Sequence, residues 1–132
     1  MVKNYNDEEA IRETLNYFFS GLDTLDAETI KKAFHPQARS FSMTPRGLCE
    51  EPPDHWDRTC AAAKTDPQHP FHNRSQKTNV VSLDITGTAA AAKVEWIFSG
   101  FMFTDYYNLL KIDGRWYIMG EVYHMTVSGD TD

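Results

Sequence analysis

The segment that most constrains the fold is residues 101–125, FMFTDYYNLLKIDGRWYIMGEVYHM. Its two halves are rich in Tyr, Phe, Trp, Ile and Val, which favour β-strands, and Asp113-Gly114 lies between them. An Asp-Gly pair between such runs is a strong hairpin signal, because both central residues of a type I′ turn need a positive φ. We therefore predict two long antiparallel strands joined by a two-residue turn.

This turn also predicts which side chains share a face, because successive strand residues alternate. Asp105 is expected opposite Val122, and Phe103 opposite His124. The inward face then carries Phe101, Phe103, Asp105, Tyr107, Leu109, Trp116, Ile118, Val122 and His124. The other face carries Met102, Thr104, Tyr106, Asn108, Leu110, Tyr117, Met119, Glu121, Tyr123 and Met125. A bulge would shift one strand by one residue and change these pairs.

The N-terminal half indicates helices. Apolar residues recur at helical spacing over residues 7–22, and Asn6 with Glu9 resembles a capping box. Asp26 is a natural N-cap for a short helix over about 26–34, which His35-Pro36 ends. The remaining assignments are a short strand at 38–43, a loop at 44–53, a helix at 54–64 and a loop at 65–74.

From Thr78 the apolar pattern changes to a period of two, which predicts two further strands before the hairpin. The order is typical of an α+β fold, a cone of three N-terminal helices packed on a strongly curved antiparallel sheet. We expect one domain over residues 1–132, with frayed ends at 1–6 and 127–132. Small-molecule sites often lie in the mouth between such helices and their sheet.

Composition excludes several classes of function. The chain has 132 residues and a net charge of −6 with no basic stripe, so we expect no nucleic-acid partner. It has no apolar run of about 18 residues, so we expect no membrane span. The N-terminus lacks the apolar core of a signal peptide, which indicates a cytoplasmic protein. Cys49 and Cys60 are then expected to be reduced.

Two motifs carry a family resemblance. They are Phe34-His35-Pro36-x-Ala38 and Asp105-Tyr106-x-x-Leu109-Leu110-Lys111-x-Asp113-Gly114-x-Trp116-x-Ile118. With the element order, they resemble the nuclear transport factor 2-like superfamily, and most closely its bacterial lumazine-binding-like (SnoaL-like) branch. The resemblance implies a cystatin-like cone with an interior cavity and a dimer formed through the sheet. Members include isomerase-like, dehydratase-like and cyclase-like enzymes as well as binding modules, so the fold alone does not assign a function.

Asp105 is the most informative candidate residue, because a buried carboxylate must find a partner or raise its pKa. His124 is expected on the same face of the neighbouring strand, where the two side chains could form an acid/base pair. The alternative is a purely structural hydrogen-bonded pair. Tyr17 either packs or donates its hydroxyl to a ligand oxyanion.

Aromatic side chains supply the candidate ligand-binding residues. Trp56, Trp96, Phe101, Phe103 and Tyr107 would line a cavity suited to a small hydrophobic or heteroaromatic ligand, or simply form core. His35 is explained either by a helix C-terminus or by a place in the cavity. His69-x-x-His72, even with His55, falls short of the usual zinc ligand sets, so we expect no metal and no cofactor.

Three functions stay open from the sequence. The first is a small-molecule-binding domain, the second a cofactor-independent isomerase, dehydratase or cyclase, and the third an interaction module whose interior is only core. In each case we expect a homodimer through the outer sheet face, because Tyr106, Tyr117, Met119 and Tyr123 make that face apolar.

Overall fold

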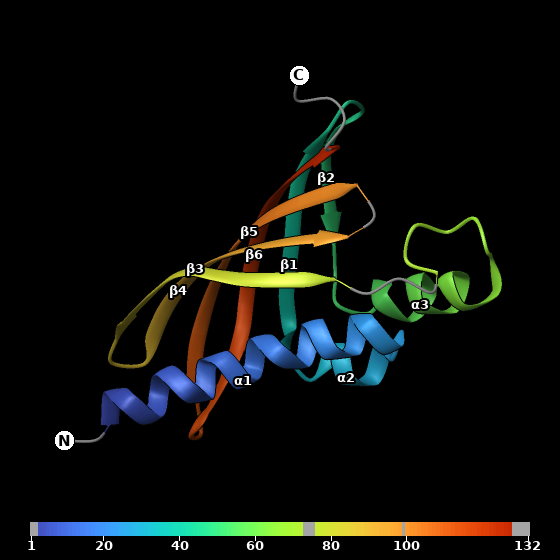
Figure 1. Ribbon diagram of the computed structural model, residues 1–132. Helices are drawn as coiled ribbons and strands as arrows, with labels where there is room; N and C mark the ends of the chain where they lie inside the picture. The colour runs from blue at the N-terminus through green and yellow to red at the C-terminus, as the bar shows by residue number, and fades with distance from the viewer. Residues whose placement is uncertain (1–2, 73–75, 99, 128–132) are drawn as a thin grey trace.

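The computed structural model describes residues 3–72, 76–98 and 100–127, and its centre is a six-stranded sheet with the strand order β2-β1-β6-β5-β4-β3 (Figure 1). The strands are β1 (Phe34–Thr44), β2 (Gly47–Glu51), β3 (Lys77–Thr86), β4 (Ala89–Phe98), β5 (Phe101–Ile112) and β6 (Arg115–Val127). The sheet is strongly curved and unclosed, and the helices pack against it. The predicted α+β class is confirmed.

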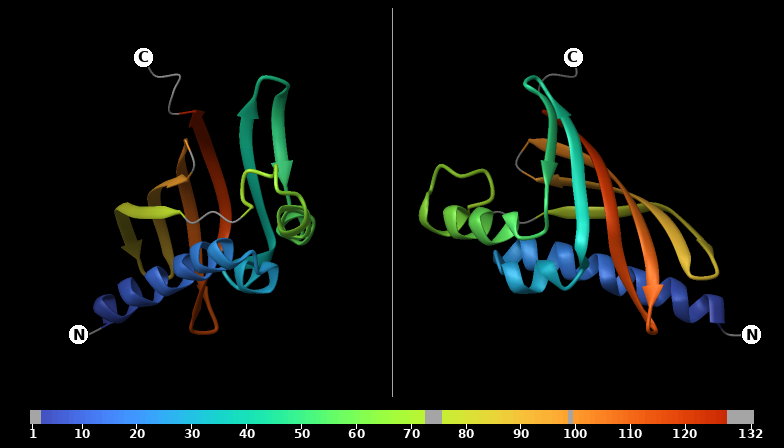
Figure 2. Two further views of the ribbon diagram at one scale, coloured as in Figure 1. Left: turned by 45° about the vertical axis from the view of Figure 1, so that its right-hand side comes forward. Right: turned by 180° about the vertical axis from the view of Figure 1, so that it is seen from behind.

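Three helices precede or interrupt the strands: α1 (Lys3–Thr24), α2 (Ala27–Lys31) and α3 (His55–Thr65). Asp26 caps α2 as predicted, since its Oδ1 accepts the backbone N–H groups of Glu28 at 3.1 Å and Thr29 at 3.4 Å. The predicted capping box at Asn6 is wrong, because α1 already begins at Lys3. Figure 2 shows α1 lying across one face of the sheet, with α3 beside the end of β2.

The edge of the sheet differs from the prediction. Residues 44–53, expected as a loop, contain β2, which pairs antiparallel with β1. Strand β1 itself spans Phe34–Thr44 and not only residues 38–43, and it runs parallel to β6. Because most of the chain lies between these two strands, no tight turn forces an antiparallel pairing. The sheet is therefore mixed.

The β5–β6 hairpin begins in the predicted register. Asp113 and Gly114 have φ values of 50° and 82°, and Ile112 pairs with Arg115. The register then shifts between Asn108, which pairs with Gly120, and Leu109, which pairs with Ile118. Met119 is the extra residue of this β-bulge.

The bulge overturns the predicted pairs beyond it. Asp105 pairs with Tyr123 and not with Val122, and Phe103 pairs with Met125 and not with His124. On β6 beyond the bulge, side chains that were predicted to point outward point inward, and the reverse, whereas those of β5 keep the predicted direction. Glu121 and Tyr123 therefore share the inward face with Asp105.

The core lies between α1 and the inward face of the sheet. Its members include Ile11, Leu15, Phe18, Phe19, Leu22, Ile30, Val94, Trp96, Phe103, Tyr107, Leu109, Trp116 and Ile118. Polar contacts fix α1 on β6: Thr14 donates its hydroxyl to the Trp116 carbonyl at 3.0 Å, and Trp116 Nε1 donates to Asp7 Oδ1 at 3.2 Å. These contacts fix α1 along the inward face of the sheet.

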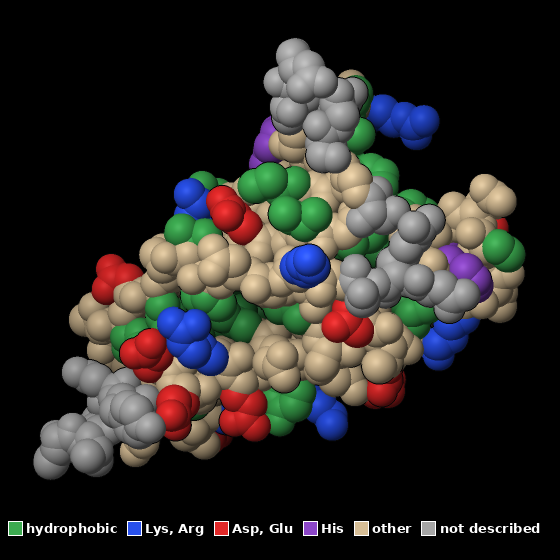
Figure 3. All heavy atoms as spheres, viewed as in Figure 1, with side chains coloured by type: hydrophobic (Ala, Val, Ile, Leu, Met, Phe, Trp, Pro, Cys, Tyr) green, Lys and Arg blue, Asp and Glu red, His purple; other side chains and the backbone are tan. Residues whose placement is uncertain are grey.

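The surface carries charges of both signs. Figure 3 shows acidic side chains interspersed with Lys and Arg over α1 and β3. Among the described residues, no helix has the length and apolar character needed to cross a membrane.

Gly21 allows α1 and α2 to approach closely. A Cβ at this position would lie 2.8 Å from both Cγ1 and the backbone N of Ile30, and 3.1 Å from the Asp26 carbonyl oxygen. Two of these neighbours are backbone atoms that cannot rotate away. We predict that Gly21→Ala lowers the free energy of unfolding by about 1–3 kcal/mol, although Ala favours helix.

Urea denaturation of the Gly21→Ala variant measures this change. The exposed neighbour Ser20, changed to Ala, is the control and should leave stability within about 0.5 kcal/mol of wild type. A Gly21→Ala protein as stable as wild type would contradict the close approach.

Candidate functional site

Asp105 lies on β5 at the centre of the inward face and is 1% exposed. Its Oδ2 accepts two hydrogen bonds, from Trp96 Nε1 at 2.8 Å and from the Tyr107 hydroxyl at 2.7 Å. Burial raises the pKa of this carboxyl, and the hydrogen bonds from Tyr107, Glu121 and Trp96 oppose the increase. The carboxylate is thus held by neutral donors and has no cationic partner among them.

Glu121 on β6 is the second buried acid of this cluster, 9% exposed. Burial raises its pKa well above the ordinary value, and the neighbouring charge and hydrogen bond of Asp105 raise it further. Two carboxylates bond to each other only if one holds a proton. Asp105 accepts from two donors that stabilise an anion, which favours Glu121 as the acid that holds a proton of the pair.

This shared proton also accounts for the one polar side-chain atom that is otherwise orphaned within the described residues. Asp105 Oδ1 is buried and has no partner when both acids are ionised. A protonated Glu121 supplies the missing donor, while its Oε1 accepts from the Ser40 hydroxyl at 2.8 Å. The acids therefore titrate as a coupled pair.

The pair belongs to a row of polar side chains that crosses five neighbouring strands. From β2 to β4 the row contains Glu51, Ser40 and Ser42, Glu121 and Tyr123, Asp105 and Tyr107, and the indole nitrogen of Trp96. Such a row is costly inside an ordinary apolar core, because each buried polar group needs a partner.

Aromatic rings surround the row. Trp96 stacks on Phe103 with ring centroids 4.1 Å apart and on Phe98 at 5.5 Å. Phe71 lies beside this stack, 4.8 Å from Phe98. Trp56 of α3 reaches the same group through Phe71 at 6.2 Å. These flat faces form one wall of the candidate site.

The β2 end of the row is partly open to solvent. Glu51 Oε1 accepts a hydrogen bond from the Tyr123 hydroxyl at 3.2 Å and lies 3.8 Å from His55 Nε2. Burial raises the pKa of Tyr123 to about 12. The side chains of His55 and Glu51 are 16% and 30% exposed. We call Glu51, His55 and Tyr123 the mouth group.

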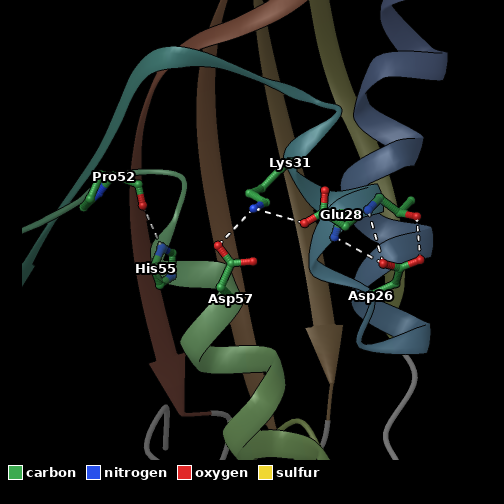
Figure 4. Close-up of polar contacts among 7 residues, drawn as sticks. Asp26, Glu28, Lys31, Pro52, His55 and Asp57 are labelled. Carbon is green, nitrogen blue, oxygen red and sulfur yellow. Dashed lines mark hydrogen bonds and ion pairs between the residues drawn. The ribbon is translucent and has the colours of Figure 1, made fainter.

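Contacts between α2, α3 and the preceding loop hold the mouth group in place. Figure 4 shows His55 at the start of α3 directed toward Pro52, whose carbonyl lies 3.1 Å from Nδ1. A proton on Nδ1 donates to that carbonyl and leaves Nε2 facing Glu51. Lys31 of α2 bridges to Asp57 of α3 at 2.9 Å.

The structure brings most of the predicted ligand-binding residues together. Trp96, Phe103 and Tyr107 surround Asp105, and Trp56 lies across Phe71 from them. Phe101 joins the edge of the aromatic wall through Phe98, at 5.6 Å.

Three other predicted residues lie elsewhere. His124 is exposed on the outward face, because the bulge turned it away from Asp105, so the predicted Asp105–His124 pair is wrong. Tyr17 packs beneath Lys32 and Arg115 near the β5–β6 turn. His35 packs edge-on against Tyr117, 5.6 Å away. The structure does not bring Tyr17 or His35 to the acid pair.

Sequence reasoning missed Glu121, Ser40 and the mouth group. The available signal was Gly120, because an isolated glycine inside a strand pattern suggests a bulge. A bulge at this position exchanges Val122 and His124 for Glu121 and Tyr123 on the inward face. The described residues contain no group of three or more His, Cys, Asp or Glu arranged to hold a metal ion.

The outward face carries a shallow groove at the bulge. Its volume is about 300 Å³, and it is lined by Gln37, Arg39, Phe41, Tyr106, Asn108, Met119, Gly120, Glu121 and Val122. Exposed apolar side chains lie on the same face, including Ile97, Tyr106, Leu110 and Val122.

Comparison with known proteins identifies the family. Residues 6–124 match the family described as "Putative lumazine-binding", and the chain belongs to this family. No curated protein matches the sequence.

Solved structures share the fold. An NTF2-like protein of unknown function from Shewanella baltica is 28% identical with a TM-score of 0.76, over 92% of this chain and 95% of that one. One from Methylobacillus flagellatus is 29% identical with a TM-score of 0.72, over 92% and 93%. A "Putative Scytalone Dehydratase" from Novosphingobium aromaticivorans is 18% identical with a TM-score of 0.68, over 94% and 89%, which shows the fold alone.

The raised pKa of Glu121 generates a pH-dependent prediction. A carboxyl whose pKa is raised by folding stabilises the protein at low pH, and that contribution is lost progressively as the pH rises from the unfolded-state pKa to the folded-state pKa. We predict that Glu121→Gln, which mimics the protonated acid, matches wild type at about pH 5. Between this pH and the folded-state pKa it should become the more stable protein by up to about 1.4 kcal/mol per pH unit. Above the folded-state pKa the difference should stay constant.

Urea denaturation of both proteins from about pH 5 to pH 9 measures the difference. Glu13→Gln on the exposed side of α1 is the control, and its difference from wild type should not change with pH in this way. A stability difference between Glu121→Gln and wild type that stays constant across the range would contradict the buried proton.

Proposed function

We propose that this chain binds a small, flat organic ligand at the mouth group, above the Asp105–Glu121 pair and against the aromatic wall. The observation that carries the proposal is the buried acid pair, which shares one proton and has no cation beside it. Packing alone gives no reason for such a pair, because apolar residues of similar volume are often neutral or stabilising at such positions. Perturbed carboxyl groups in a partly open site are typical of binding and catalytic sites.

The surrounding residues support a flat ligand. Trp96, Phe103 and Phe98 stack on one another with interplanar angles of 7° to 14° and form a flat, buried cluster. The family description also suits a small heteroaromatic ligand. Tyr123 and Trp56 are partly exposed beside these rings and provide the surface that a ligand meets first.

A second candidate function is acid–base catalysis without a cofactor, of the isomerase, dehydratase or cyclase type. The observation that favours it is the unequal environment of the two acids. An ionised Asp105 accepts a proton from the ligand while protonated Glu121 donates one, so the step is balanced. The resemblance to a dehydratase-like structure is one of fold, so this candidate depends on the acid pair.

We also propose that two copies associate through the outward sheet face. The support is the exposed apolar set on this face, in which Val122 is 52% and Tyr106 48% exposed, together with the groove at the bulge. The free thiols of Cys49 and Cys60 support a reducing, cytoplasmic location.

The binding proposal predicts the behaviour of Asp105→Asn. A thermal-shift screen of flat heteroaromatic compounds should find wild-type ligands, because binding raises the apparent stability. Asp105→Asn should weaken a hit by about 10- to 100-fold, because it changes the charge and the hydrogen bonds of the acid pair beneath the proposed site. Asp84→Asn, at an exposed position of β3, is the control. Equal affinities of wild type and Asp105→Asn would exclude the acid pair from the site.

The same hits distinguish a binder from an enzyme. In D₂O, acid–base chemistry at a carbon atom exchanges ligand C–H for C–D, which proton NMR detects. The catalytic candidate predicts exchange with wild type and at least about 100-fold slower exchange with Asp105→Asn. A binder gives affinity without exchange.

The dimer proposal predicts a sedimenting mass of twice the 15.1 kDa monomer at micromolar concentration. Val122→Glu should give a monomer, because it places a charge in the centre of the apolar face. Val81→Glu, at an exposed valine of the edge strand β3, is the control that should remain a dimer. A wild-type monomer rules out the association.

A further inference from the structure

The mouth group and the acid pair together make the candidate site negative. We propose that the site selects flat ligands that carry positive charge, such as protonated or N-alkylated heteroaromatic rings. Glu51 is the residue whose carboxylate interacts with this charge. This inference rests on the proposed ligand site and goes beyond it by assigning the chemical class of the ligand.

The inward face around the mouth is acidic in composition. From Asp105 to the open end, the described inward side chains of β1, β2 and β4–β6 include three acids, Asp105, Glu121 and Glu51, and no Lys or Arg. Of these three acids, Glu51 is the one that solvent reaches, since its side chain is 30% exposed.

Two cations of neighbouring elements are directed elsewhere. Arg39 lies on the outward side and pairs with Glu50 at 3.4 Å. Lys31 is held by Asp57 at 2.9 Å and by Glu28 at 3.3 Å. Each of these two cations is therefore paired with an acid outside the mouth group.

Glu51 lies where a ligand entering the mouth would meet it. Its Oε1 is oriented by the Tyr123 hydroxyl, yet the side chain is 30% exposed and can meet a ligand. His55 makes no hydrogen bond to it, because Nδ1 lies 3.1 Å from the Pro52 carbonyl and Nε2 lies 3.8 Å from the Glu51 carboxylate. Glu51 is thus a fixed and accessible anion at the entrance.

The charged and aromatic groups near Glu51 also favour a flat cation. The negative charge of Glu51 contributes to the raised pKa of Glu121 and of Tyr123, so its field reaches along the polar row. Trp56 and Phe71 lie with tilted rings 6.2 Å apart beside the mouth group, and the face of an aromatic ring attracts a cation. Charge and stacking therefore favour the same ligand, a flat cation.

Three probes of similar size and different charge test this inference: 1-methylquinolinium, neutral quinoline and quinoline-4-carboxylate. Their affinities for wild-type protein are measured by isothermal titration calorimetry at about pH 8 and low salt. We expect the cation to bind at least about fivefold more tightly than quinoline, and the carboxylate to bind more weakly than quinoline.

Two matched variants test whether Glu51 causes the preference for the cation. Glu51→Gln should reduce the preference for the cation over quinoline about fivefold. Glu50→Gln removes the same charge from the adjacent residue of β2, on the outward side, and should retain the wild-type preference.

The outcomes separate this inference from the proposed function. If wild type binds the three probes equally, the charge selection is wrong while the binding site stands. If wild type prefers the cation but Glu51→Gln does so equally, or Glu50→Gln loses the preference as fully, the assignment to Glu51 is wrong. If none of the probes binds, both the inference and the proposed site are contradicted. The wild-type comparison requires no variant, so a poorly folded Glu51→Gln protein leaves the test of charge selection intact.

Discussion

One extra residue in β6 determines what each face of the sheet does. Met119 has no partner on β5, so every side chain beyond it is shifted by one position relative to the turn at Asp113-Gly114. Because side chains alternate with a period of two, this single residue turns Glu121 and Tyr123 inward and Val122 and His124 outward. Without the bulge, Asp105 and His124 would share the inward face, and Glu121 would lie on the outward face. With it, the acids meet each other and the apolar side chains reach the outer surface.

The acid pair is stable in the fold because its neighbours are donors. Trp96 and Tyr107 each give a hydrogen bond to Asp105, and Ser40 gives one to Glu121. Hydrogen bonds to a charged group contribute about 1.5–3 kcal/mol each, which offsets several kcal/mol of desolvation. The same balance places the proton on Glu121. A cluster of this kind keeps the fold intact while leaving a negative charge that is not neutralised from within.

Local patterns predicted most of the elements, and long-range geometry accounts for the errors. The Asp113-Gly114 turn, the Asp26 cap and the inward direction of Asp105 each follow from one residue and its neighbours, and all are observed. The edge strand β2 was missed because its five residues pair only with β1 and show no clear period. The partner of Asp105 was missed because it depends on the count of residues between Gly114 and Glu121. The only local indication of one extra residue is Gly120, yet that residue changes which β6 side chains face Asp105.

Energetics connect the two faces of the sheet. A protein gains little stability from a buried acid pair. The electrostatic repulsion within the pair is a free-energy cost that a suitable bound ligand can relieve. A cation at the mouth relieves repulsion between Glu51 and the pair, whereas an anion increases it. The bulge that creates this repulsion also moves Val122 outward, where burial against a second copy would return apolar stabilisation. The extra residue Met119 thus lowers the stability contributed by the inner face. It also places apolar area on the outer face, whose burial between two copies can offset that loss.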